Sequence, residues 1–224
     1  MLKPPKSIKN KEMEKDPFLD SVNKLQNHYK NKRSLYIQVA CCILAIVGIF
    51  NFLVGKSEIS NSKSSALLGI SLIALEKNDL ENAKIQFESL IDEFPKTENA
   101  HIAKFYLGKI KYNEKLYSES EKLLLDHYKG AKNSLLKIST IVMLSDIYSM
   151  NKDYSTALDW LKKGEKIQSN PYFKDLLKIE QAKVLLKLGK KDESKDILSS
   201  LIEKENINQR HKQLAEELIS SNIG

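Results

Sequence analysis

The chain has 224 residues, of which 42% are hydrophobic and 29% are charged, so most of it can fold around a buried core. Eight glycines and five prolines are too few for a turn-rich all-β protein, and the abundant leucine and lysine favour helices. The net charge of +7 is concentrated in residues 1–33, which carry nine basic and four acidic residues. The remainder mixes both signs, and this argues against an extended basic surface for nucleic acids.

Residues 1–33 are predicted to form a basic cytoplasmic tail that contains an amphipathic helix over residues 17–31. Asp16 is a suitable N-cap, and Pro17 suits the first position of a helix. One face of this helix consists of Phe18, Val22, Leu25 and Tyr29. The neighbouring lysines favour an interfacial helix that lies on anionic lipid, and a surface for a cytoplasmic protein is the alternative.

Residues 34–54 form a stretch of 21 residues without a charge. A helix of this length is about 31 Å long, which is enough to cross the hydrocarbon core of a membrane. The alternative is a cleaved signal peptide, but 33 residues precede this stretch and its apolar region is longer than such peptides have. The basic flank predicts a single-pass helix with a cytoplasmic N-terminus. Cys41 and Cys42 lie inside it, so neither a disulfide framework nor a metal site is expected.

After a linker at residues 55–63, the sequence repeats with a period of 37 residues, in segments beginning near positions 64, 101, 138 and 175. Each segment is predicted to be a pair of antiparallel helices that stacks on its neighbours. Small residues recur where the paired helices approach: Ser71, Gly108, Ser145 and Ala182 in the first helices, and Ala83, Ser120, Ala157 and Ser194 in the second. Bulky residues that fill the seam are Phe87, Leu124, Leu161 and Leu198.

Residues 208–220 add one more amphipathic helix, which suits a terminal cap. The expected fold is therefore all-α, with a single N-terminal transmembrane helix followed by an α-solenoid. The solenoid, at residues 64–224, has about four helix pairs plus a C-terminal capping helix. The pattern of small and bulky residues resembles tetratricopeptide repeats, although the period of 37 exceeds the roughly 34 residues of that family.

The layout over residues 16–224 is similar to that of the YfgM-like ancillary subunits of the SecYEG translocon. This resemblance implies a bacterial inner-membrane protein with a periplasmic repeat domain. It also implies partners among translocon subunits, periplasmic chaperones or unfolded clients, and handover of emerging chains to those chaperones. The alternative function is an envelope assembly or division scaffold that clusters membrane partners. Self-association is open under both.

No pattern of catalytic residues is found. The histidines His28, His101, His127 and His211 are dispersed without metal-ligand spacing, and nucleotide-binding and hydrolase motifs do not occur. Adjacent acidic residues such as Glu216 and Glu217 fit a solvated helix face. Neither catalysis nor a cofactor is therefore expected.

The resemblance to the repeat family places a protein-binding surface on the first helices of the pairs. The expected contact residues are Leu68, Leu72, Leu75, Phe105, Tyr112, Val142 and Ile179, with Asp146, Met150 and Leu186 on the same surface. Each has a core position between neighbouring pairs as its alternative. Trp160, on a second helix, is expected to pack against neighbouring helices, with a partner contact as the alternative.

The first helix of the first repeat, at residues 64–75, is apolar on nearly its whole circumference. Leu67, Ile70 and Ala74 are expected to face the core, and Leu68 and Leu72 lie on other sides. Because no repeat precedes this helix, we expect either a contact with a second copy or a membrane partner, or coverage by residues 55–63 and the rest of the array.

Overall fold

The computed structural model describes residues 17–132, 134–167 and 170–222, and the regular secondary structure of these residues is α-helical throughout. The chain divides into two compact units, Met1–Ser57 and Glu58–Gly224. Helix α1 (Pro17–Glu76) supplies residues to both units. It begins at the residue expected from the sequence, while the predicted N-cap Asp16 lies outside the described residues.

In the first unit, α1 contains a candidate membrane span, Lys32–Phe50, with a mean hydropathy of 1.9. Its side chains are exposed, and only its length and composition mark it as a candidate. Of the amphipathic face, Phe18, Val22 and Tyr29 are exposed, and the side chain of Leu25 lies outside the described residues. Residues 55–63, expected as a linker, are helical and belong to α1, because no proline interrupts them.

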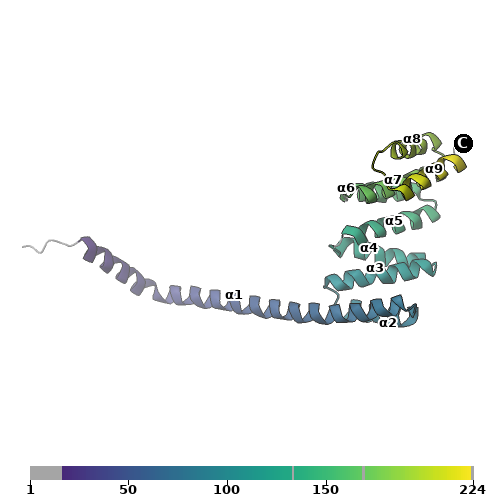
Figure 1. The fold of residues 1–224 in the computed structure, drawn as a ribbon. Coiled ribbons are helices and arrows are strands. Elements are labelled where there is room, and N and C mark those ends of the chain that lie inside the picture. Colours follow the sequence, from purple (N-terminus) through teal and green to yellow (C-terminus); the bar gives the residue numbers. More distant parts are fainter. Residues whose placement is uncertain (1–16, 133, 168–169, 223–224) are drawn as a thin grey trace, which may run out of the picture. The chain divides into compact units, whose positions relative to one another are not determined.

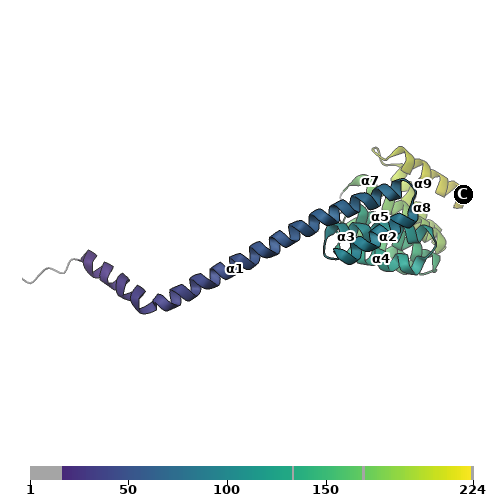
Figure 2. The same ribbon diagram turned by 90° about the horizontal axis from the view of Figure 1, so that it is seen from below.

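The second unit is a stack of helix pairs (Figures 1 and 2). After the end of α1 come α2 (Leu80–Glu93), α3 (Glu98–Asn113), α4 (Tyr117–Gly130), α5 (Ser134–Met150), α6 (Tyr154–Ile167), α7 (Pro171–Lys187), α8 (Lys191–Ile202) and α9 (Gln209–Asn222). The pairs are α1 with α2, α3 with α4, α5 with α6, and α7 with α8, and α9 packs on the last pair. The expected solenoid of four pairs and a cap is confirmed.

The first helices of the pairs form the inner layer of this stack. From α2 to α9, consecutive helices contact each other, and α3, α5, α7 and α9 also contact one another in sequence. Within the described parts of the chain, no such contacts join α4 to α6 or α6 to α8. The second helices therefore lie further apart, and the array curves around the first helices.

The small residues predicted at the seams are buried in all four pairs. In two pairs a serine of the second helix also bonds to the first helix, with Ser120 Oγ donating to the Gly108 carbonyl (2.8 Å) and Ser194 Oγ to the Ala182 carbonyl (3.0 Å). The four bulky seam residues are fully buried: Phe87, Leu124, Leu161 and Leu198. The close approach therefore stabilises each pair through packing and satisfied polar groups.

The same turn joins the two helices of every pair. Asn78, Lys115, Lys152 and Gly189, spaced 37 residues apart, have φ between 59° and 77°. In the first turn, the Asn78 N–H bonds to the Leu75 carbonyl and the Asp79 N–H to the Ala74 carbonyl, which is the Schellman arrangement. The other three turns repeat both bonds. The left-handed residue reverses the chain within two positions, and this aligns the second helix against the first.

The outward side of the first repeat corrects one expectation. Ile70, expected in the core, is 53% exposed, because no preceding pair covers it. Leu67 and Ala74 are half-buried, and Leu68 packs into the core with Ala83 and Phe87.

Candidate functional site

Four of the seven expected contact residues remain accessible on the inner layer. Leu72, Leu75, Tyr112 and Val142 are half-buried. The other three, Leu68, Phe105 and Ile179, are buried in the core, which is the alternative position considered for each of them. These three share one register position with Val142, at 37-residue spacing, close to where neighbouring first helices contact each other. Packing between repeats therefore occupies their side chains.

A hollow of about 420 Å³ lies on the inner layer between α5, α7 and α9. It is lined by Val142, Ser145, Asp146, Ser149, Glu180, Lys183, Val184, Leu186, Lys187 and Leu218. Three of these, Val142, Asp146 and Leu186, belong to the surface expected from the sequence. We call this hollow the inner groove.

Two polar pairs define the charged wall of the inner groove. The Tyr112 hydroxyl of α3 donates to Asp146 Oδ2 of α5. Burial raises the pKa of Tyr112, and the hydrogen bond to Asp146 and its negative charge raise it further, so Tyr112 stays a protonated donor. On α7, Lys183 Nζ lies 2.8 Å from Glu180 Oε1. Both acidic side chains are thus oriented by a partner.

The floor of the inner groove contains a buried hydroxyl. Ser149 is 4% exposed, and its Oγ has no hydrogen-bond partner among the described residues. Leaving such a group unsatisfied costs about 1–3 kcal/mol, so a polar group that bonds to it would gain affinity only if the hydroxyl turns toward the groove. Leu186 and Leu218, both half-buried, supply apolar surface beside it. The groove is therefore suited to a polypeptide segment with one apolar side chain and nearby main-chain polar groups.

A second hollow, of about 380 Å³, lies where α1 turns into α2 and packs near the end of α3. Its lining consists of Leu75, Asn78, Leu80, Tyr106, Lys109, Ile110, Asn113 and Glu114. Of the contact residues expected from the sequence, only Leu75 lines this second hollow.

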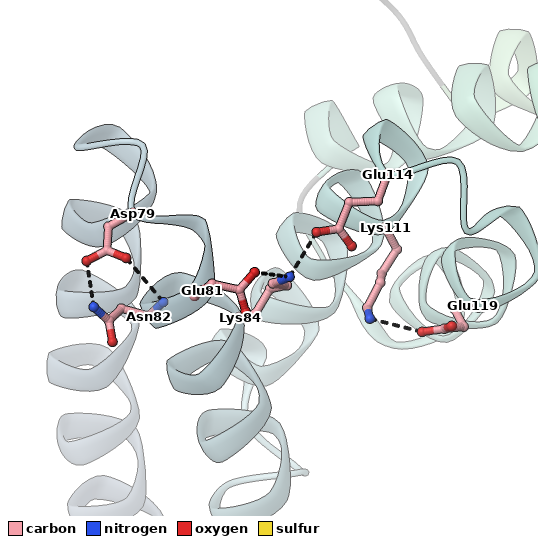
Figure 3. Close-up of polar contacts among 7 residues, drawn as sticks. All are labelled: Asp79, Glu81, Asn82, Lys84, Lys111, Glu114 and Glu119. Carbon is pink, nitrogen blue, oxygen red and sulfur yellow. Dashed lines mark hydrogen bonds and ion pairs between the residues drawn. The ribbon is translucent and has the colours of Figure 1, made fainter.

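An ion-pair network ties the helices together beside this second hollow (Figure 3). Lys84 Nζ lies 2.6 Å from Glu81 Oε1 and 2.9 Å from Glu114 Oε1, which raises the pKa of Lys84 above its usual range. Lys111 Nζ of α3 lies 3.0 Å from Glu119 Oε2 of α4. These pairs join the ends of the helices, and they neutralise Glu114 in the lining of the hollow.

The histidines of the repeats take packing positions. His127 is buried, and its Nδ1–H donates to the His101 carbonyl (2.8 Å) across the α3–α4 seam. Burial lowers the pKa of His127, of half-buried His101 and of His211. In the described parts of the chain, no three His, Cys, Asp or Glu residues are grouped so that they could hold a metal ion. Trp160 also packs, edge-on to Tyr128 with ring centroids 4.9 Å apart.

Ser149 and Lys183 line the inner groove but were not expected from the sequence. A usable signal exists for Ser149, since positions 75, 112, 149 and 186 share one register and the expected surface includes three of them. A serine at a register of mostly apolar residues indicates a binding group only once its burial is known. Leu218 has no such signal, because it belongs to α9, whose approach to α5 is a property of the curved array.

Comparisons with known proteins agree with the repeat architecture. The family model described as a tetratricopeptide repeat-like domain matches residues 27–216. Among solved structures, this chain is similar to YrrB, described as a TPR protein with an unusual peptide-binding site, with a TM-score of 0.51 and 15% sequence identity. The similarity covers 69% of this chain and 75% of YrrB, and it shows a common fold. No curated protein sequence matches this chain.

Proposed function

Because the chain belongs to the tetratricopeptide repeat-like family, we propose that it is a non-enzymatic scaffold that binds a polypeptide segment in the inner groove. The observation that carries this proposal is the buried Ser149 hydroxyl, which has no partner among the described residues and lies beside apolar side chains. The peptide-binding site named for YrrB, a protein of similar fold, supports the same class of ligand.

The groove binds its segment through three kinds of contact. An apolar side chain of the partner packs on Leu186, and a main-chain group bonds to the Ser149 hydroxyl when that hydroxyl turns toward the groove. Lys187, on the same wall, attracts an acidic group of the partner.

In the full proposal, the chain is anchored by α1 in a bacterial inner membrane with the repeat domain in the periplasm. There it serves as an ancillary subunit of the Sec translocon that passes emerging chains to periplasmic chaperones. The candidate span in α1 and the basic residues before it support the anchor and its orientation. The second candidate function is an envelope assembly or division scaffold, which the same anchor and groove would serve.

The groove is tested by photocrosslinking in cells that express the full chain. A photoreactive residue at position 186, in the inner groove, is expected to capture polypeptide partners, and the same residue at Lys122, exposed on the outer helix α4, is the control. The substitution Val142→Asp is expected to reduce the capture at position 186 at least tenfold. Equal capture from both positions would contradict binding in the groove.

Two experiments test the anchor and the translocon role. A reporter that is active only outside the cytoplasm should be active when fused after position 224 and silent when fused after position 15. Purification of the full chain from detergent-solubilised membranes should recover translocon subunits. Other envelope proteins without translocon subunits would favour the second candidate function, and the reverse reporter pattern would contradict the orientation.

A further inference from the structure

The side of α1 that faces away from its own repeat is apolar and exposed. Within the second unit, Ile59 is 60% exposed, and Ile70 and Ile73 are each 53% exposed. Ala66 and Gly69 lie between them and are also exposed, and a side chain added at Gly69 would meet open space. Large exposed apolar groups that share one helix face indicate an interaction surface.

The later repeats show what this side of a first helix packs against. The residues one, two and three periods after Ala66, Ile70 and Ile73 are Ala103, Leu107, Ile110, Thr140, Leu144, Ile147, Leu177, Gln181 and Val184, and all are buried. There, α3, α5 and α7 each contact the second helix of the preceding pair. The exposed side of α1 therefore continues a helix-packing interface that the fold already uses three times.

The C-terminal end of another copy does not suit the exposed side of α1. Helix α9 covers the last pair with Ala215, and it exposes Gln213, Glu216, Glu217 and Ser220. Stacking this polar face of one copy on the isoleucines of another would bury polar and charged groups beside apolar ones without partners. Head-to-tail association of copies is thus disfavoured, and a contact between two identical faces remains.

The spacing on α1 fits such a contact. Ile59, Ser62, Ala66, Gly69 and Ile73 are separated by three, four, three and four residues, which is the spacing of a coiled-coil seam, and all five are uncharged. We call these five residues the α1 seam. In the sequence, small residues continue at the same seven-residue interval at Gly55, Gly48 and Cys41.

Charges beside the α1 seam favour a parallel second copy. Glu58 and Lys63 flank the seam on opposite sides, five residues apart, and both are exposed. In a parallel pair of helices, this is the spacing at which an acid of one helix meets a base of the other. In the described residues of a single copy, neither side chain forms an ion pair.

From these observations we propose that two copies of the chain associate in parallel through the α1 seam, with Glu58 of each copy paired to Lys63 of the other. Isoleucines at Ile59 and Ile73 pack across the seam, and Ala66 and Gly69 let the helices approach closely. This association is independent of the inner groove.

The first test measures the protein mass of the full chain in detergent micelles by light scattering. The wild type is expected to be a dimer, and Ile73→Asp a monomer with unchanged helical circular dichroism. Ile85→Asp is the matched control, because Ile85 is 62% exposed and its register equivalents Lys122, Asp159 and Asp196 are exposed and charged. It should remain a dimer. A monomeric wild type, or a dimeric Ile73→Asp variant, would overturn the proposal.

A charge exchange separates a second copy from any other partner. Glu58→Lys should raise the dimer dissociation constant several-fold, since two positive charges would then face each other across the seam. The double change Glu58→Lys with Lys63→Glu should restore the original value. A partner with a different sequence would not carry the matching substitutions, so its binding would not be restored in the double variant. A double variant with a higher dimer dissociation constant than the single variant would overturn the parallel pairing.

Crosslinking tests the register directly in membranes. In a chain with Cys41 and Cys42 replaced by alanine, Ile73→Cys should form a disulfide-linked dimer on mild oxidation. Glu88→Cys, exposed on α2, should not. Absence of the crosslink at position 73, or equal crosslinking at both positions, would overturn the proposal.

Discussion

The first and third repeats place side chains of the same kind at the same register and give them opposite environments. Ile70 and Ile73 of α1 are half exposed, whereas Leu144 and Ile147 of α5, two periods later, are fully or almost fully buried. The helices themselves are alike in seam residues and in the left-handed residue that follows. The difference comes from the neighbour: a second helix packs on α5, and within one copy none precedes α1.

In a repeat array, stability therefore resides in the interfaces between repeats as much as in the repeats themselves. At the C-terminal end, α9 covers the last pair and presents a polar outer side. The N-terminal end keeps apolar residues, and a second copy would cover them.

The largest effect is expected from a truncation at the buried register. Leu144→Ala should cost about 2–5 kcal/mol of the free energy of unfolding, because it leaves a cavity in the core. Ile70→Ala, at the same register, should cost less than about 0.5 kcal/mol in chain diluted to the monomer. Urea unfolding followed through Trp160, the single tryptophan, measures both. Equal costs would mean that one copy covers its own first helix.

A smaller loss is expected from overpacking a seam. Ala157 is fully buried where α5 and α6 approach, so Ala157→Trp should cost about 1–3 kcal/mol or more. The matched change Ile85→Trp, on the outer side of α2, should leave the melting temperature nearly unchanged. Thermal unfolding by circular dichroism measures both. A stable Ala157→Trp variant would show that the third pair is looser than its register indicates.

The turns should respond by less than the core. Lys115 has φ of 63°, so Lys115→Gly should stabilise the chain by roughly 0.5–1 kcal/mol, and Gly189→Ala, at φ of 77°, should destabilise it by a similar amount. Asn78→Gly in the first repeat should change stability less, because asparagine tolerates this conformation better than lysine. The melting temperatures of the three variants measure these effects. A larger rise in melting temperature for Asn78→Gly than for Lys115→Gly would contradict this order.

The pH dependence of stability should come from the later repeats. Burial lowers the pKa of His127 below its unfolded value of about 6.5, so the unfolded chain binds the proton more readily than the folded one. This contribution to stability is complete above that value and is lost as the pH falls below it. The melting temperature should therefore fall between pH 7.5 and 5.5, and fall less in His127→Gln. The first repeat has Leu90 at this register and does not contribute. An equal fall in the variant would exclude His127 as a source.

Most of the fold follows from local patterns in the sequence. The seam residues, the turns at 37-residue intervals and the capping helix were predictable because each depends on residue size or on spacing along one helix. The binding surface was less predictable. Phe105 and Ile179 share a register with Val142, and only Val142 is left accessible in the inner groove, with the buried Ser149 hydroxyl close by.

Residue composition and spacing are enough to predict the all-helical class, the four pairs with their cap, the uncharged stretch in α1 and the family to which the chain belongs. Which apolar residues are core and which are surface depends on how the helices pack in three dimensions. It showed Ile70 exposed where Leu107 and Leu144 are buried, and it joined α5, α7 and α9 into one groove. This is because periodicity indicates the helix face on which a side chain lies, whereas its burial depends on whether another helix packs against that face.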